Sequence, residues 1–201
     1  MALPSYDKSK RMKSTSFELL PKGAYVIVIK NVKQEPNRKS GIGEHLAIAF
    51  DIAEGQYKGF YEKQYKAITE GEKRWPGDAV FYLSIPENDS PDWMWRNWNT
   101  FFADLEDSNN GFAFSGDITT LRGKLIGGKF YNNQSQSKNG TVYDHTQLKW
   151  TCVAADVRNG KPGVMPKDNL VKATGQVKPE EPSGDVPEWM EVGEEDADLP
   201  F

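Results

Sequence analysis

Residues 45–53 read His-Leu-Ala-Ile-Ala-Phe-Asp-Ile-Ala, and this stretch indicates the fold class of the chain. Every second residue from Leu46 to Ile52 is large and apolar, while the residues between them are small or polar. A period of two places all the large side chains on one face of a β-strand. The stretch therefore predicts a strand that covers a core with one face and leaves the other face accessible.

Segments on both sides of this strand predict its neighbours in an antiparallel sheet. Residues 24–33 are rich in β-branched residues at strand length, and the turn-forming residues 36–43 connect them to 45–53. Residues 60–67 follow a second turn and are expected to form the third strand. Further strands are expected at 79–85, a short additional one, and at 124–132 and 141–153, a final pair.

A single long helix is expected after the third strand. It begins near Asp92 and carries Trp95, Trp98 and Phe102 at steps of three and four residues, which predicts an aromatic stripe that packs into the core. Three strands, a helix and two further strands are the order of the OB-fold, a five-stranded, partly open barrel. We expect this mainly β fold over residues 21–168, and a β-sandwich or another small barrel is the alternative.

The composition divides the chain into an aromatic-rich body and polar ends. Only 37% of the 201 residues are hydrophobic although 12% are aromatic, which indicates that part of the chain stays outside any core. Residues 1–20 are expected to form a basic arm. Residues 169–201 lack a periodic apolar pattern, so we expect a disordered tail there.

Charge is distributed unevenly between the body and the tail. Residues 173–201 hold nine acidic residues and one basic residue, Lys178. Without them, the whole-chain counts of 25 basic and 29 acidic residues fall to 24 and 20, so residues 1–172 carry a net charge of +4 although the chain carries −4. A basic body is able to attract polyanions.

Several classes of protein are disfavoured by what the sequence lacks. There is no phosphate-binding Gly-rich loop, no nucleophile elbow and no His-Glu-x-x-His motif, so we expect no enzyme activity and no cofactor. One cysteine, Cys152, with His45 and His145, cannot form a disulfide or a zinc site. No apolar run is long enough to span a membrane and no signal peptide is evident, so a cytoplasmic protein of a bacterial cell or phage-infected host is expected.

The carboxyl terminus carries the most specific motif. An acidic run leads into Leu-Pro-Phe with a free carboxylate, and such a peptide can fill an apolar pocket while its charges pair with basic residues at the rim. This end resembles the bacterial and phage single-stranded-DNA-binding proteins, which terminate in an acidic tip followed by Ile or Leu, Pro and Phe. The resemblance implies that the tip binds replication, recombination and repair proteins through Asp196, Asp198, Leu199, Pro200 and Phe201.

The body is also similar to phage-encoded OB-type members of that family, chiefly through residues 51–59, Asp-Ile-Ala-Glu-Gly-Gln-Tyr-Lys-Gly. Binding single strands without sequence preference requires aromatic rings for base stacking and cations for phosphates. Aromatic and cationic residues alternate or adjoin at several places in the body, including one face of the expected third strand and the first hairpin loop. The expected DNA contacts are Arg38, Lys39, Tyr61, Lys63, Tyr65, Arg74, Trp75, Lys129, Tyr131, Tyr143 and Lys149.

The sequence thus predicts a protein that coats and protects single-stranded DNA during replication or recombination and recruits partners through its tip. Two alternatives stay open. One is a recombination mediator or strand-annealing protein, and the other is a protein-interaction adaptor whose acidic tail mimics DNA. Whether the chain assembles with copies of itself is also open.

Overall fold

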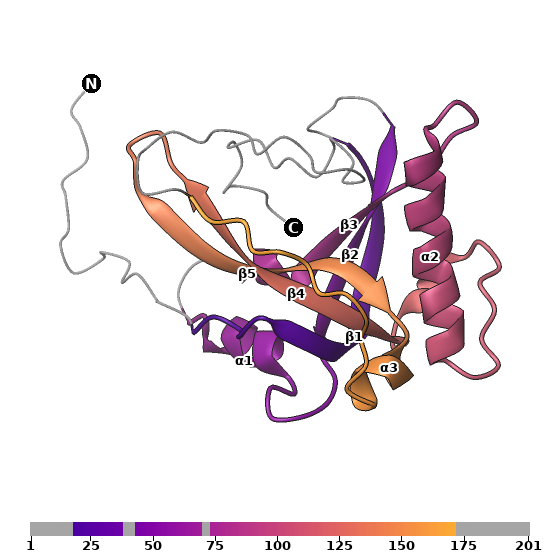
Figure 1. Ribbon diagram of the computed structural model, residues 1–201, viewed down its shortest axis with the longest axis horizontal. Coiled ribbons are helices and arrows are strands. Elements are labelled where there is room, and N and C mark those ends of the chain that lie inside the picture. Colours follow the sequence, from indigo (N-terminus) through magenta and orange to yellow (C-terminus); the bar gives the residue numbers. More distant parts are fainter. Residues whose placement is uncertain (1–17, 38–42, 70–72, 172–201) are drawn as a thin grey trace, which may run out of the picture.

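The computed structural model describes residues 18–37, 43–69 and 73–171 and is mainly β (Figure 1). Its five strands form one antiparallel sheet in the order β3-β2-β1-β4-β5, so five of the six segments expected as strands are strands. The strands are β1 (Gly23–Pro36), β2 (Glu44–Ile52), β3 (Val80–Ser84), β4 (Leu125–Gln136) and β5 (Val142–Cys152). The helices are α1 (Phe60–Ala67), α2 (Asp92–Ser108) and α3 (Ala154–Arg158), with short 3-10 turns η2 (Gly77–Ala79) and η3 (Ile118–Leu121).

Strand β1 organises the sheet because it pairs with two different partners along its length. Its first half, from Gly23 to Val28, pairs with β4, while the second half, from Ile27 to Pro36, pairs with β2. The register with β2 shifts between Ile29 and Asn31, which marks a β-bulge at Lys30. A bulge increases the local twist and re-aims a side chain, so the sheet curls strongly at this point.

The third strand is not where the sequence pattern placed it. Residues 60–67 form the helix α1, and the short segment expected as an additional strand is the third strand of the sheet, β3. Tyr61 and Tyr65 are spaced two residues from Lys63, which fits a strand, but they are also four apart, which fits a helix face. The prediction was wrong because the side-chain carboxylate of Asp51 on β2 accepts hydrogen bonds from the first turn of the helix.

The core lies between the concave face of the curled sheet and α2. Phe50 and Leu105 are both 0% exposed, and Phe130 is 1% exposed. The long helix is confirmed, but all the buried residues of α2, Phe101 among them, lie in its C-terminal half. Trp95, which was expected in the core, lies near the start of the helix and is 38% exposed, while Trp98 and Phe102 do pack against the core.

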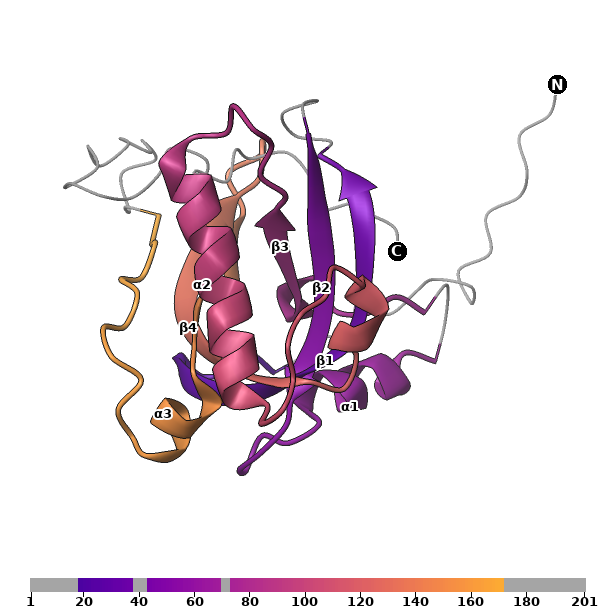
Figure 2. The same ribbon diagram turned by 90° about the vertical axis from the view of Figure 1, so that its right-hand side faces the viewer.

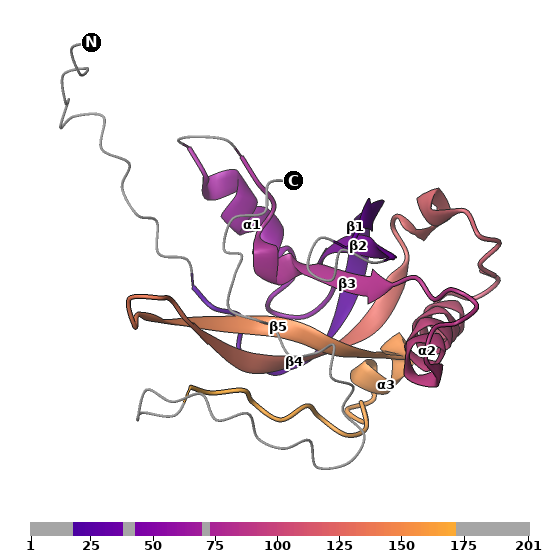
Figure 3. The same ribbon diagram turned by 90° about the horizontal axis from the view of Figure 1, so that it is seen from above.

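The helices lie on different sides of the sheet. Figures 1 and 2 show α2 along one side, and α1 well apart from it near β2. Residues 162–171, the C-terminal strap, run back along β4 and β5 on the side away from α1 (Figure 3). The strap is attached by Asn169, which forms a parallel bridge with Asn133 and hydrogen-bonds to the backbone of Asn132 and Gln134. None of the described helices is both long and apolar enough to cross a membrane.

Strands β3 and β5 form the two edges of the sheet, which is open between them. Side chains connect these edges: His145 Nδ1 of β5 lies 3.1 Å from Asp78 Oδ1 of η2, and Gln147 donates to the same carboxylate at 3.4 Å. The hydrogen bond that the His145 ring donates to Asp78 raises the pKa of His145 above its ordinary value, although burial opposes this. The protonated histidine therefore stabilises the folded state.

This contact predicts a pH-dependent stability that His145→Gln removes. A histidine with a raised pKa stabilises the fold fully below the pKa of the unfolded state, about 6.5, and this contribution is lost as pH rises through the folded pKa. The Tm advantage of wild type over His145→Gln should therefore shrink as pH rises, as measured by circular dichroism. Asp78→Asn should likewise remove the pH-dependent part of the stability. If the Tm difference between wild type and His145→Gln stays constant from about pH 5.5 to about pH 8, the contact between His145 and Asp78 does not stabilise the fold as described.

Candidate functional site

A groove crosses the outer face of β1, β2 and β3 and continues onto the segment after α1. Alternation along β2 explains its floor, because Leu46, Ile48 and Phe50 point into the core and leave Ala47 and Ala49 on the opposite face. The small alanine side chains leave room above the strand. We name this the cationic groove; it is lined by Lys30, Asn31, Lys33, Ala47, Ala49, Tyr65, Lys73, Arg74, Trp75 and Val80.

The charged residues that the structure describes in the lining of the cationic groove are all basic. Four of its lining residues are Lys or Arg, and among the described lining residues none is Asp or Glu. Two of these cations come from β1 and two from the segment before η2, so they flank the alanine floor from different parts of the chain. Cations on both sides of a groove with an uncharged floor suit an extended polyanion.

Two aromatic rings form one wall of the groove. The rings of Tyr65 and Trp75 lie 5.6 Å apart between centroids, at an interplanar angle of 43°. The indole N–H of Trp75 donates to the backbone oxygen of Phe50 at 3.2 Å, and Lys73 Nζ lies 5.7 Å from the centre of the Tyr65 ring. Both rings are only partly buried, so part of their surface faces the groove.

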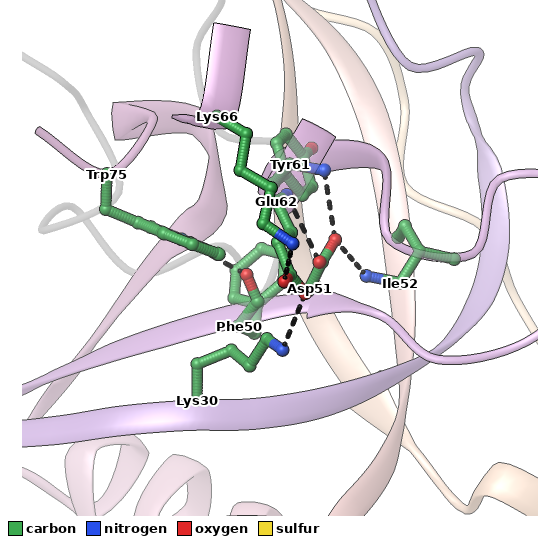
Figure 4. Close-up of polar contacts among 8 residues, drawn as sticks. All are labelled: Lys30, Phe50, Asp51, Ile52, Tyr61, Glu62, Lys66 and Trp75. Carbon is green, nitrogen blue, oxygen red and sulfur yellow. Dashed lines mark hydrogen bonds and ion pairs between the residues drawn. The ribbon is translucent and has the colours of Figure 1, made fainter. Parts of the chain in front are cut away.

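The helix α1, which supplies Tyr65, is held by a buried carboxylate on β2 (Figure 4). Asp51 is 1% exposed and accepts from the backbone N–H groups of Ile52, Tyr61 and Glu62, at 2.8, 3.0 and 3.2 Å. Two of these N–H groups belong to the first turn of the helix, which has no partners within the helix for them. Burial raises the pKa of Asp51 above its ordinary value, and these backbone donors together with Lys30 act in the opposite direction.

A second depression adjoins the cationic groove on the other side of Trp75. It shares Lys30, Tyr65 and Trp75 with the groove and extends to Arg122 after η3. Glu62 is its acidic residue, with Oε1 2.6 Å from Lys66 Nζ and Oε2 3.1 Å from Lys30 Nζ. We name this the Glu62 trough; it is lined by Val28, Ile29, Lys30, Glu62, Tyr65, Lys66, Trp75, Arg122 and Gly123.

The structure brings three of the predicted contact residues together in the cationic groove: Tyr65, Arg74 and Trp75. Two other predicted contact residues lie outside this groove. Tyr61 is 2% exposed in the core, and Lys63 is exposed on α1 outside both depressions. Both were selected on the assumption that residues 60–67 form a strand, and a helix turns alternate residues to different sides.

The sequence pattern did not indicate the two cations of β1 as DNA contacts. Lys30 and Lys33 interrupt the apolar run of β1, and this interruption is the only local signal for them. The direction in which the Lys30 side chain points depends on the bulge at this position, where the register with β2 shifts. Because a bulge is set by pairing with a partner strand, a pattern within residues 24–33 does not show it.

Three other predicted residues gather on β4 and β5, away from the groove. Lys149 Nζ lies 5.1 Å from the ring centre of Tyr131 and 5.8 Å from that of Trp150, and Lys129 Nζ lies 5.9 Å from the Trp150 ring. Lys129 also donates to Pro162 O of the strap at 3.2 Å. Burial lowers the pKa of Lys149. This aromatic–lysine cluster is thus engaged with the strap and with itself.

The remaining predicted residues are more dispersed. Tyr143 lies near the start of β5 and is 51% exposed. Arg38 and Lys39, expected in the first hairpin loop, lie outside the described residues. The tip residues Asp196, Asp198, Leu199, Pro200 and Phe201 also lie outside them.

Neither the protein-family models nor the curated proteins compared with this chain match it.

Proposed function

We propose that the protein binds single-stranded DNA without sequence preference along the cationic groove. The observation that carries this proposal is the combination of four cations, no described acidic residue and two partly exposed rings around an alanine floor. Phosphates would pair with Lys33, Lys73 and Arg74, while bases stack on Trp75 and Tyr65. Stacking requires unpaired, accessible base faces, which a single strand offers and a duplex does not.

The strand arrangement supports the finer proposal of an OB-type barrel. Strand β1 pairs with both β2 and β4, and α2 follows β3 and precedes β4 along the chain. The open edges β3 and β5 approach each other where His145 contacts Asp78. OB-folds bind oligonucleotides on the face of their second and third strands. The cationic groove lies on that face, which agrees with the proposed activity.

Partner recruitment through the C-terminal tip is part of the same proposal and rests on the sequence. The acidic tail ending in Leu199, Pro200 and Phe201 has the charge and the terminal apolar residue of a docking peptide. The partners implied are replication, recombination and repair proteins.

The proposed activity predicts binding that weakens with salt. The three proposed phosphate contacts, Lys33, Lys73 and Arg74, give a slope of about −2 for log K against log salt concentration, because a single strand releases about 0.7 counterion per contact. The measurement is a titration of the full chain with oligo-deoxythymidine at several salt concentrations, followed by tryptophan fluorescence. Trp75 should be quenched on stacking.

A duplex of the same length is the control ligand and should bind more weakly. If no saturable binding to oligo-deoxythymidine is found at low salt, or if the duplex binds equally well, the proposed function is wrong.

A further inference from the structure

We propose that the Glu62 trough is a second phosphate-binding subsite, which extends the cationic groove and is occupied by the Glu62 carboxylate in the free protein. This inference rests on the proposed function, because the ligand is the sugar-phosphate chain of the same single strand. It adds Lys66 and Arg122 to the binding surface and gives Glu62 the role of a competing anion.

Continuity between the two depressions supports an extended path. Lys30, Tyr65 and Trp75 line both of them, so a chain that stacks on Trp75 passes directly from one to the other. Arg122, an exposed residue after η3, lines the trough but not the cationic groove. The backbone of the next residue holds this segment against β1, because Gly123 donates to Ile29 O at 2.8 Å.

The carboxylate of Glu62 stands where a phosphate group would bind. Its two oxygens contact two different lysines, Lys66 at 2.6 Å and Lys30 at 3.1 Å (Figure 4). A phosphate group also offers oxygens to more than one cation, so it can replace the carboxylate with the same donors. The hydrogen bonds from Lys66 and Lys30 lower the pKa of Glu62, so the competing group is anionic at neutral pH.

The contacts of Glu62 are weak enough to exchange. The side chains of Lys30 and Glu62 are 38% and 37% exposed, and that of Lys66 is 70% exposed. Ion pairs in contact with water contribute little to stability, so releasing them does not endanger the fold. Glu62 also remains attached through its backbone N–H, which donates to Asp51. The side chain is therefore free to move while the helix keeps its position.

An oligonucleotide that reaches the trough must displace Glu62 and then lie beside its charge. Removing that charge should therefore strengthen binding. We expect Glu62→Gln to raise the affinity for long oligo-deoxythymidine about fivefold, the effect of one unit charge at contact distance in water. The matched control is Asp107→Asn, which removes one exposed acidic charge on α2, away from both depressions.

The length of the oligonucleotide separates this inference from the proposed function. The full chain is titrated with oligo-deoxythymidine of about 4 and of about 12 nucleotides, lengths within the range of sites on single OB-folds. Arg122→Ala and Lys66→Ala should each weaken binding of the longer ligand about fivefold while changing the shorter one little. Thermal melts of each variant show whether folding is intact.

The possible outcomes have distinct meanings. If wild type binds neither ligand, the proposed function fails and this inference fails with it. If wild type binds both, but Glu62→Gln and Arg122→Ala leave the ratio of long to short affinities unchanged, only the second subsite is refuted. An affinity gain from Asp107→Asn equal to that from Glu62→Gln would also refute it, because net charge alone would then explain the effect.

Discussion

Replacing both Lys73 and Arg74 with glutamate should weaken binding of oligo-deoxythymidine about a hundredfold at low salt. The double variant removes two of the four cations of the cationic groove and places two anions beside the strand. Each lost phosphate contact and each new repulsion is worth about 1 kcal/mol in water, which screening reduces. The slope of log K against log salt should also fall by about 1.4 because two phosphate contacts are lost.

The control for this variant has the same change in net charge at a different place. Lys58 and Lys161 are exposed and lie outside both the cationic groove and the Glu62 trough. We expect the Lys58→Glu, Lys161→Glu double variant to lose affinity only severalfold, through the general field of the protein. Equal losses in the two double variants would mean that the groove is not the binding site.

The second large effect is expected at Asp51. Asp51→Ala should lower the free energy of unfolding by about 3 kcal/mol, because it leaves buried backbone N–H groups at the start of α1 without an acceptor. The same substitution should weaken oligo-deoxythymidine binding, since α1 carries Tyr65 into the cationic groove. Urea denaturation measures the first effect, and fluorescence titration under native conditions measures the second.

Two comparison variants identify the cause of this loss. Asp51→Asn keeps one acceptor oxygen but directs an NH2 group at a backbone donor, so an intermediate loss of about 2 kcal/mol is expected. Asp89→Ala removes an exposed carboxylate from the loop before α2 and should change stability by less than about 0.5 kcal/mol. If Asp51→Ala were as mild as Asp89→Ala, the carboxylate would not anchor α1.

Part of the candidate site was predictable because its residues are adjacent in the sequence. Arg74 and Trp75 are neighbours, and a cation next to an aromatic residue is visible in the sequence itself. Lys30 was not predictable in this way. Its role depends on a bulge against β2 and on an ion pair with Glu62, a residue of a different element.

The helix α1 shows why one element was assigned incorrectly. Residues 60–67 satisfy both a strand pattern and a helix pattern, and their own side chains do not decide between the two. The decision comes from Asp51, which lies ten positions before Tyr61 and satisfies the first turn of the helix from the neighbouring strand. Such an acceptor acts only after β2 has folded against the start of α1.

The sequence by itself determined the mainly β character of the chain, its long aromatic helix and the separation of a basic body from an acidic tail. These follow from periodicity and composition, because apolar side chains spaced two or three to four residues apart can be buried together in only one type of element. Tertiary structure alone decided which cations and rings share a surface. Lys30, Tyr65 and Arg122 meet around Trp75 because strand pairing, the bulge and the Asp51 contacts bring distant segments together. Those contacts depend on three-dimensional partners that no local pattern encodes.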